Sequence, residues 1–277
     1  MIFVNHCHVF PKSPDLEAQL GTIGTLDKLV ETMKKCGIQR AVAFAPFRER
    51  GWSPSFGESP NRWLIEELPS YPELVGFACI NPKSPGAVRE LEEAWRGGLL
   101  GVKLHPAIQK FRPNDRRFFR FYEKAQELGL ILDFHTGSHG WRLLEYQPLL
   151  LDDIAHAFPR LKIVVEHVGG RHFYNQALAL LMDKENVYAG VTSCLDENNK
   201  AWFLGPRKIE ELAHLIGPER MIYGTDFPYN DWRRIRSDIN IIKSLNLTQS
   251  AKESILGASL EKLLKTQGKN EGETIAK

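Results

Sequence analysis

The sequence has 277 residues and little cysteine: only Cys7, Cys36, Cys79 and Cys194, with no CxxC pair among them. Such wide spacing in so large a chain excludes a disulfide framework and a zinc site built from cysteines. We interpret the four as small buried side chains in a reducing compartment. We therefore expect a cytoplasmic protein.

The sequence also lacks an excess of charge of one sign, because 36 lysines and arginines stand against 34 aspartates and glutamates, for a formal net charge of +2. Nucleic acids and anionic membranes both favour a basic excess, so we expect neither as a partner. No apolar stretch approaches the roughly 18 residues that span a bilayer. The first residues carry histidines where a signal peptide has a basic segment and an apolar core, so we expect none. A small-molecule substrate is the expected partner.

Short apolar runs alternate with amphipathic stretches along nearly the whole sequence. The predicted strands are Ile2–His8, Arg40–Ala45, Leu74–Ile80, Leu99–His105, Leu130–His135, Lys162–His167, Val187–Thr192 and Arg220–Thr225. The predicted helices are Thr25–Cys36, Pro60–Leu68, Pro85–Arg96, Asp115–Leu128, Trp141–Ala157, Arg171–Asp183, Pro206–Ile216 and Trp232–Ser244. The strands end near positions 8, 45, 80, 105, 135, 167, 192 and 226, and the 25 to 37 residues between successive ends leave room for a crossover helix.

These eight units predict an α/β protein with a parallel sheet, since a helical crossover returns the chain in the same direction. Eight units close into a (β/α)8 TIM barrel. An open doubly wound sheet is the alternative, but no GxGxxG motif follows the first strand. We also predict an extra C-terminal helix over Thr248–Leu264, one domain over residues 1–265, and a polar, disordered tail over residues 266–277.

The sharpest motif is His6-Cys7-His8, at the end of the first predicted strand. Because side chains alternate along a strand, both imidazoles should leave the same face, with Cys7 on the other. Neutral imidazole is the commonest protein ligand for metals, so two on one face form half of a site. An isolated pair of this kind is weak evidence, because it also arises by chance.

Other polar side chains also stand at predicted strand ends, namely His105, His135, His167 and Asp226. In a barrel, the carboxyl ends of the strands converge on the face that carries the active site. The alternative is a set of separate histidines with unrelated structural roles, which requires several coincidences. The pattern therefore favours one shared site.

These motifs resemble the amidohydrolase-related metal-dependent enzymes, a family of hydrolases and decarboxylases that includes aminocarboxymuconate-semialdehyde decarboxylase. The matching segments follow the family's order over residues 1 to about 230: His6–Pro11, Gly101–Pro106, Phe134–Gly137, Glu166–Gly170 and Tyr223–Pro228. The resemblance implies that one divalent ion is bound by His6, His8, His135 and Asp226. It also implies that His167 is the catalytic histidine beside the metal.

One position departs from the family pattern, which usually has Asp two residues before the first ligand, where this chain has Val4. By alternation Val4 would share the inward face of His6, so a hydrogen-bonding partner of the site would be missing. This departure is the only support for a different class of function, a catalytically idle metal-binding barrel.

Lys103 and His105 also lie two residues apart and should share a face. Lys103 could be carbamylated and bridge two metals, as in binuclear relatives of the wider superfamily. We favour a lysine deeper in the barrel, paired with a carboxylate such as Asp226. His105 is expected to line the site as a hydrogen-bond donor.

A site of three histidines and one carboxylate suits Zn²⁺, and Mn²⁺, Fe²⁺, Co²⁺ or Ni²⁺ would also fit. Such an ion lowers the pKa of bound water toward about 7, while Asp226 can accept its proton and His167 can stabilise an oxyanion or move a proton. The leading hypothesis is a metal-dependent hydrolase of a small ester, lactone or amide. A decarboxylase or hydratase of a small aromatic or unsaturated carboxylate is the runner-up.

Clues to the substrate come from side chains in the predicted strand-end loops and helix starts. Arginine binds carboxylates with a bidentate fork, and tryptophan stacks on flat rings. The candidates for substrate binding are therefore Arg48, Arg50, Trp52, Arg171, His172 and Trp202, beside Lys103 and His105. By analogy with other barrels of this resemblance, we expect a homodimer.

Overall fold

The computed structural model describes residues 1–265, and the predicted polar tail over residues 266–277 lies outside the described residues. Within residues 1–265, no helix is both long and apolar enough to cross a membrane. That residues 1–265 form a single domain stays a prediction.

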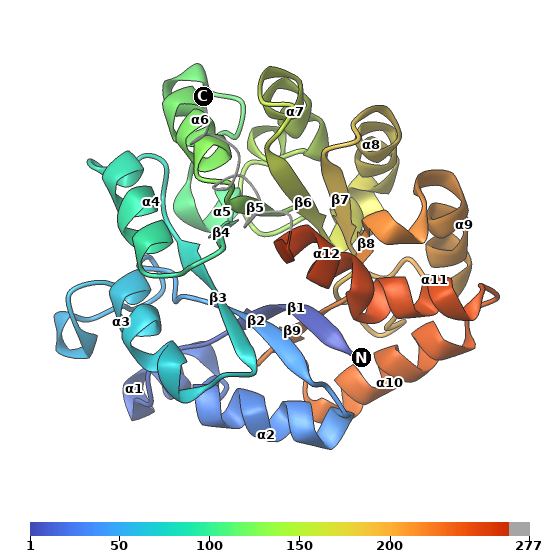
Figure 1. Ribbon diagram of the computed structural model, residues 1–277, viewed down its shortest axis with the longest axis horizontal. Helices are drawn as coiled ribbons and strands as arrows, with labels where there is room; N and C mark the ends of the chain where they lie inside the picture. The colour runs from blue at the N-terminus through green and yellow to red at the C-terminus, as the bar shows by residue number, and fades with distance from the viewer. Residues whose placement is uncertain (266–277) are drawn as a thin grey trace, which may run out of the picture.

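Within residues 1–265, nine parallel strands form one nearly closed barrel, as predicted (Figure 1). They are β1 (Phe3–His8), β2 (Arg40–Phe44), β3 (Leu74–Cys79), β4 (Gly101–Leu104), β5 (Ile131–His135), β6 (Lys162–Glu166), β7 (Val187–Gly190), β8 (Met221–Ile222) and β9 (Gly224–Phe227). The order around the sheet is β8-β7-β6-β5-β4-β3-β2-β1-β9. The predicted eighth strand is interrupted at Tyr223, so that β8 pairs with β7 while β9 pairs with β1.

The helices surround the barrel (Figure 1). They are α1 (Pro14–Leu20), α2 (Leu26–Cys36), α3 (Pro60–Glu67), α4 (Ala87–Arg96), α5 (Pro106–Gln109), α6 (Phe119–Glu127), α7 (Asp152–Ala157), α8 (Gly170–Asp183), α9 (Pro206–Ile216), α10 (Trp232–Ser244), α11 (Gln249–Glu253) and α12 (Ser259–Lys265). Side-chain caps begin several of them, as where the Thr25 hydroxyl accepts from the Lys28 amide at α2 and Asp231 caps α10.

Two predicted helices are wrong in extent. The stretch predicted as Trp141–Ala157 is two short 3₁₀ turns followed by α7, and the second turn begins at Pro148, which has no backbone amide to continue a helix. The predicted Thr248–Leu264 helix is broken into α11, one π-helical turn over Ser254–Ala258, and α12. Its break lies at Gly257, where a Cβ would come within 2.6 Å of the Phe3 amide nitrogen.

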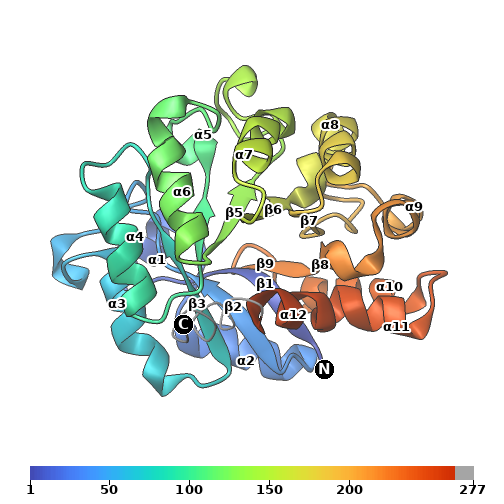
Figure 2. The same ribbon diagram turned by 45° about the horizontal axis from the view of Figure 1, so that its top comes forward.

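In the part of the chain that the structure describes, apolar side chains form two separate cores. One fills the barrel itself and includes Phe3, Phe44 and Phe77, together with leucines of α12. The other lies between the outer face of the sheet and the surrounding helices, and it includes Val4, Cys7 and Val102. Figure 2 shows α12 beside β1 and β2. Membership of one core or the other therefore tells which face of a strand a residue occupies.

Candidate metal centre

Strand β1 does not alternate strictly, because His6 has a left-handed backbone with φ +60°. Two residues lie between Val4 and Cys7, while only one lies between their partners Ala41 and Ala43 on β2. The extra residue is a β-bulge that turns His6 to the inside, next to Asn5. The expected inward position of Val4 is therefore wrong.

Val4 packs in the outer core, and Asn5 supplies the inward polar group at this level of the barrel. Its side-chain amide donates to Asp133 Oδ2 over 2.7 Å and to Glu166 Oε1 over 2.8 Å. The hydrogen-bonding partner that Val4 was expected to remove is thus present one residue later. This finding weakens the only argument for an idle barrel.

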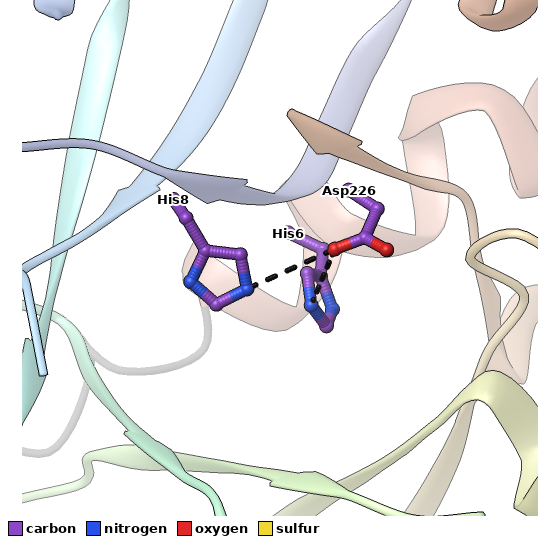
Figure 3. A group of neighbouring side chains, drawn as sticks. All are labelled: His6, His8 and Asp226. Atoms are coloured by element: carbon purple, nitrogen blue, oxygen red, sulfur yellow. Dashed lines mark ion pairs between the residues drawn. The ribbon is translucent and has the colours of Figure 1, made fainter. Parts of the chain in front are cut away.

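His6, His8 and Asp226 gather at the carboxyl end of the barrel (Figure 3). The Nε2 atoms of His6 and His8 lie 3.6 and 3.8 Å from the same oxygen of Asp226, Oδ1. Each residue offers one ligand atom, and the three atoms lie within 4.8 Å of one another. The other oxygen of Asp226, Oδ2, accepts from the hydroxyl of Ser193 over 3.3 Å, which leaves Oδ1 toward the histidines.

His135, the fourth predicted ligand, lines the same cavity but is not part of that three-residue group. Its ring stacks on His105 with centroids 3.7 Å apart and planes 10° apart. Its Nε2 is buried and has no hydrogen-bond partner among residues 1–265. A buried nitrogen without a partner fits a ligand position, because such a group is costly unless something binds it.

The charge states of the histidines also fit a metal centre. Burial lowers the pKa of His8 and His135 well below the usual range, and nearby His6 and His105 respectively lower it further. Both imidazoles are therefore neutral near pH 7, and neutral imidazole is the form that binds zinc-like ions. The donor set in this structure is compatible with a divalent ion of that kind.

His167 stands beside this group, with its ring centroid 5.0 Å from that of His6. Its Nδ1 lies 3.0 Å from the backbone carbonyl of Thr192, and since a carbonyl can only accept, Nδ1 carries the proton. Nε2 is then an acceptor. Burial, reinforced by His6, lowers the pKa of His167 to about 4, so the side chain is neutral near pH 7.

A buried polar layer lies beneath the histidines, inside the barrel. Lys103 Nζ donates to Asp133 Oδ1 over 2.6 Å, and both side chains are fully buried. The expected pairing of Lys103 with Asp226 is therefore wrong, although the expectation of a lysine paired with a deep carboxylate is right. The partner is Asp133 because it lies on β5 directly opposite Lys103 of β4.

The two carboxylates of this layer have opposite pKa shifts. Burial raises the pKa of Asp133 to about 6, although Lys103 opposes that shift. Burial also acts to raise the pKa of Glu166, but His6 and Lys103 outweigh it and hold this pKa well below the usual range. Glu166 is therefore the carboxylate that stays ionised beside His6.

The cavity above the histidines has a volume of about 940 Å³ including its opening to solvent. Its walls are mostly aromatic. Among residues 1–265, Arg50 is the only lysine or arginine whose side chain lines this cavity. Among the predicted substrate-binding residues, Trp52 and His105 line it, as does Trp202. Arg48 and Arg171 do not line it and are exposed, His172 is exposed and contacts Ser138, and Lys103 lies below it.

Sequence reasoning missed several polar residues around the site: Asn5, Asp133, His139, Glu166, Thr192 and Ser193. Asp133 had a usable signal, because it lies two residues before His135 and so shares its face. Glu166 and Asn5 had none, since each directly precedes a site histidine and alternation places it on the opposite face. Left-handed residues overturn that expectation at His6 and His167.

Comparison with known proteins gives a family match over nearly the whole chain: residues 6–264 match the family model described as amidohydrolase. A segment of 114 residues is 40% identical to the dihydroorotase of Helicobacter hepaticus. This match covers 38% of the chain and 32% of that protein, so the chain spans about a third of the length of this curated relative.

Several solved structures share the fold. An uncharacterised TIM-barrel protein from Bordetella bronchiseptica is 20% identical, with a TM-score of 0.76 over 96% of this chain and 99% of that one. The 5-carboxyvanillate decarboxylase LigW from Sphingomonas paucimobilis is 13% identical, with a TM-score of 0.73 over 95% and 98%. A dihydroxybenzoic acid decarboxylase from Polaromonas, solved with bound manganese and 2-nitroresorcinol, is 15% identical, with a TM-score of 0.69 over 95% and 96%.

Proposed function

The chain belongs to the amidohydrolase family, and on that premise we propose that it is a metal-dependent hydrolase of a small ester, lactone or amide. Members of this superfamily are enzymes, and so is this chain. Zn²⁺ is the ion we propose, because two imidazoles and a carboxylate face one point. The four cysteines are free and buried, in keeping with the cytoplasmic location that we also propose.

The observation that carries this proposal is the convergence of His6 Nε2, His8 Nε2 and Asp226 Oδ1 beneath a cavity that His167 also lines. His135 supplies a further unpartnered nitrogen at the same cavity. A bound divalent ion would activate water and polarise a substrate oxygen there. These residues come from three different strands, as expected for a barrel active site.

The chain's own side chains account for the proton transfers that hydrolysis needs. The Asp226 carboxylate lies beside the histidines and can take a proton from an attacking water, while Ser193 donates to its Oδ2 and so orients it. His167 has its acceptor nitrogen, Nε2, available to take up a proton and return it to the leaving group. Thr192 fixes this tautomer through the carbonyl that accepts from Nδ1.

The cavity walls suggest a flat substrate with an anionic group. Trp202 packs against His167 at a centroid distance of 4.5 Å, and Trp52 and Phe47 also line the cavity. Arg50 can bind a carboxylate at the rim, because guanidinium forms paired hydrogen bonds with it. The same walls favour a second candidate, decarboxylation of an aromatic or unsaturated carboxylate.

The test is to assay apo protein and protein reconstituted with Zn²⁺ or Mn²⁺ against lactones, esters, amides and aromatic carboxylates. We expect hydrolysis that requires metal and is lost in His8→Ala. His156→Ala is the matched control, since this histidine is exposed on α7, away from the cavity. Release of CO2 without any hydrolytic product would replace the hydrolase by the decarboxylase, and equal activity in both variants would refute the assigned site.

A further inference from the structure

We propose that Glu166 is a positioning residue for His6, one that fixes which ring nitrogen of His6 carries the proton and so makes the other available to a metal. The inference rests on the proposed metal site, because His6 is one of its ligands. Nε2 of His6 faces Asp226, and Nδ1 lies 3.1 Å from Glu166 Oε2 on the opposite side of the ring. When a carboxylate faces Nδ1 of a neutral imidazole, the proton stays on Nδ1 and the lone pair that can bind a metal is on Nε2.

Glu166 is itself held from two sides. Thr192 Oγ1 donates to Oε2 over 2.6 Å, and the Asn5 amide donates to Oε1 over 2.8 Å. The carboxylate is fully buried, as is Thr192. Hydrogen bonds to an ionised group are strong, and together they leave the carboxylate little freedom to turn away from His6.

Two glycines leave the space that this arrangement needs. Gly190 is paired with Glu166 across β6 and β7, and a Cβ there would lie 2.4 Å from Glu166 Cδ. At Gly224 a Cβ would lie 2.1 Å from Thr192 Oγ1 and 2.8 Å from His6 Cβ. Neither glycine has the left-handed backbone that would by itself explain the residue type. The space beside these glycines is instead occupied by the side chains of Glu166, Thr192 and His6.

The contact between His6 and Glu166 is close but not aligned as a hydrogen bond, and Nδ1 has no hydrogen-bond partner among residues 1–265. Catalytic hydrogen bonds are often poorly aligned until a ligand is bound. Nε2 of His6 is directed at Asp226, so Nδ1 is the nitrogen left to carry the proton. Glu166 Oε2, 3.1 Å away, is the group placed to accept a hydrogen bond from it. Its role therefore concerns the affinity of the site, in addition to any reaction there.

The decisive experiment measures the Kd of Zn²⁺ and Mn²⁺ by competition with a chromogenic chelator in wild type, Glu166→Gln, Thr192→Val and His6→Ala. Gln keeps the shape of the side chain but removes its charge. We expect a 10- to 100-fold weaker Kd in Glu166→Gln and a smaller loss in Thr192→Val. Asp238→Asn is the matched control, because it neutralises a buried carboxylate on α10 and should leave the Kd unchanged.

Nitrogen NMR of the His6 ring in the apo protein supplies a second readout, which a purely structural role would not change. We expect the proton on Nδ1 in wild type and a mixture of tautomers in Glu166→Gln. If His6→Ala abolishes binding while Glu166→Gln and Thr192→Val bind like wild type, the positioning role is refuted and the metal site stands. If His6→Ala binds metal like wild type, the proposed metal site itself is wrong. Should Glu166→Gln fail to fold, Thr192→Val decides.

Discussion

Replacing Gly190 with alanine should weaken metal binding although no ligand is altered. The new Cβ would stand 2.4 Å from Glu166 Cδ and 2.5 Å from its Oε2. Carbon atoms pack at about 3.5–4.0 Å, so the carboxyl group must move by roughly 1 Å or more. Such a shift breaks the 2.6 Å hydrogen bond from Thr192 and withdraws Glu166 from His6.

The size of the effect follows from two contributions. Overpacking a dense interior costs about 1–3 kcal/mol of the free energy of unfolding, and the lost hydrogen bond to a charged group adds about 1.5–3 kcal/mol. We expect the Kd for Zn²⁺ or Mn²⁺ to rise by about 10- to 100-fold, as is usual when the partner of a metal ligand is disturbed. Urea unfolding of the apo protein and chelator competition measure the two quantities separately.

Gly76→Ala is the matched control, because a Cβ at Gly76 would lie 2.4 Å from Leu99 Cδ2 and 2.5 Å from Leu68 Cδ1. These leucines belong to the outer core, so the steric conflict is comparable but lies on the other face of the sheet. We expect similar destabilisation with an unchanged Kd. Equal losses of affinity in both variants, or none in Gly190→Ala, would refute the reasoning.

Three further predictions concern other parts of the molecule. Lys103→Met should lower the free energy of unfolding by about 3–5 kcal/mol in urea titrations, because Asp133 loses its buried cation. Arg50→Met should raise KM for a carboxylate substrate by about 10- to 100-fold, with a smaller change in kcat, if Arg50 binds that group. Burial raises the pKa of Asp238 from 3.8 to about 6, so its contribution to stability is present below pH 4 and lost as pH rises through 6. The free energy of unfolding of Asp238→Asn should therefore rise relative to that of wild type between pH 4 and 7, by ~3 kcal/mol at most. Urea unfolding across this pH range checks it, and a difference between the two proteins that does not change with pH would contradict the prediction.

The barrel could be predicted from the sequence because the burial of its strands leaves a strong pattern. Both faces of a parallel strand are covered, so runs such as Ile131–Phe134 are continuously apolar apart from a functional residue. Helix ends were also visible, since Gly37 and Gly217 close α2 and α9. The short helix α1 was missed, although Ser13 caps it and Pro14 begins it, because seven residues carry too little periodicity.

What could not be predicted depends on contacts between distant parts of the chain. The partner of Lys103 follows from the register of β4 against β5, which sequence spacing does not contain. The break at Gly257 arises from its close approach to Phe3, more than 250 positions away in the sequence. In both cases local propensity was compatible with several outcomes, and tertiary packing selected one.

The left-handed residues explain most directly why the site departs from the expected alternation. His6, His167 and Asp226 have φ of +60°, +62° and +56°, a conformation that costs about 1–3 kcal/mol at a residue other than glycine. A regular strand presents only every second side chain to the barrel, whereas this centre uses Asn5 beside His6 and Glu166 beside His167. At His6 and His167 the left-handed backbone allows two neighbours in sequence to face inward. Of the six residues other than glycine that have a positive φ among residues 1–265, three belong to the predicted site. Backbone strain, which is independent of the histidine pattern, is therefore concentrated there, as it is in other strained functional sites.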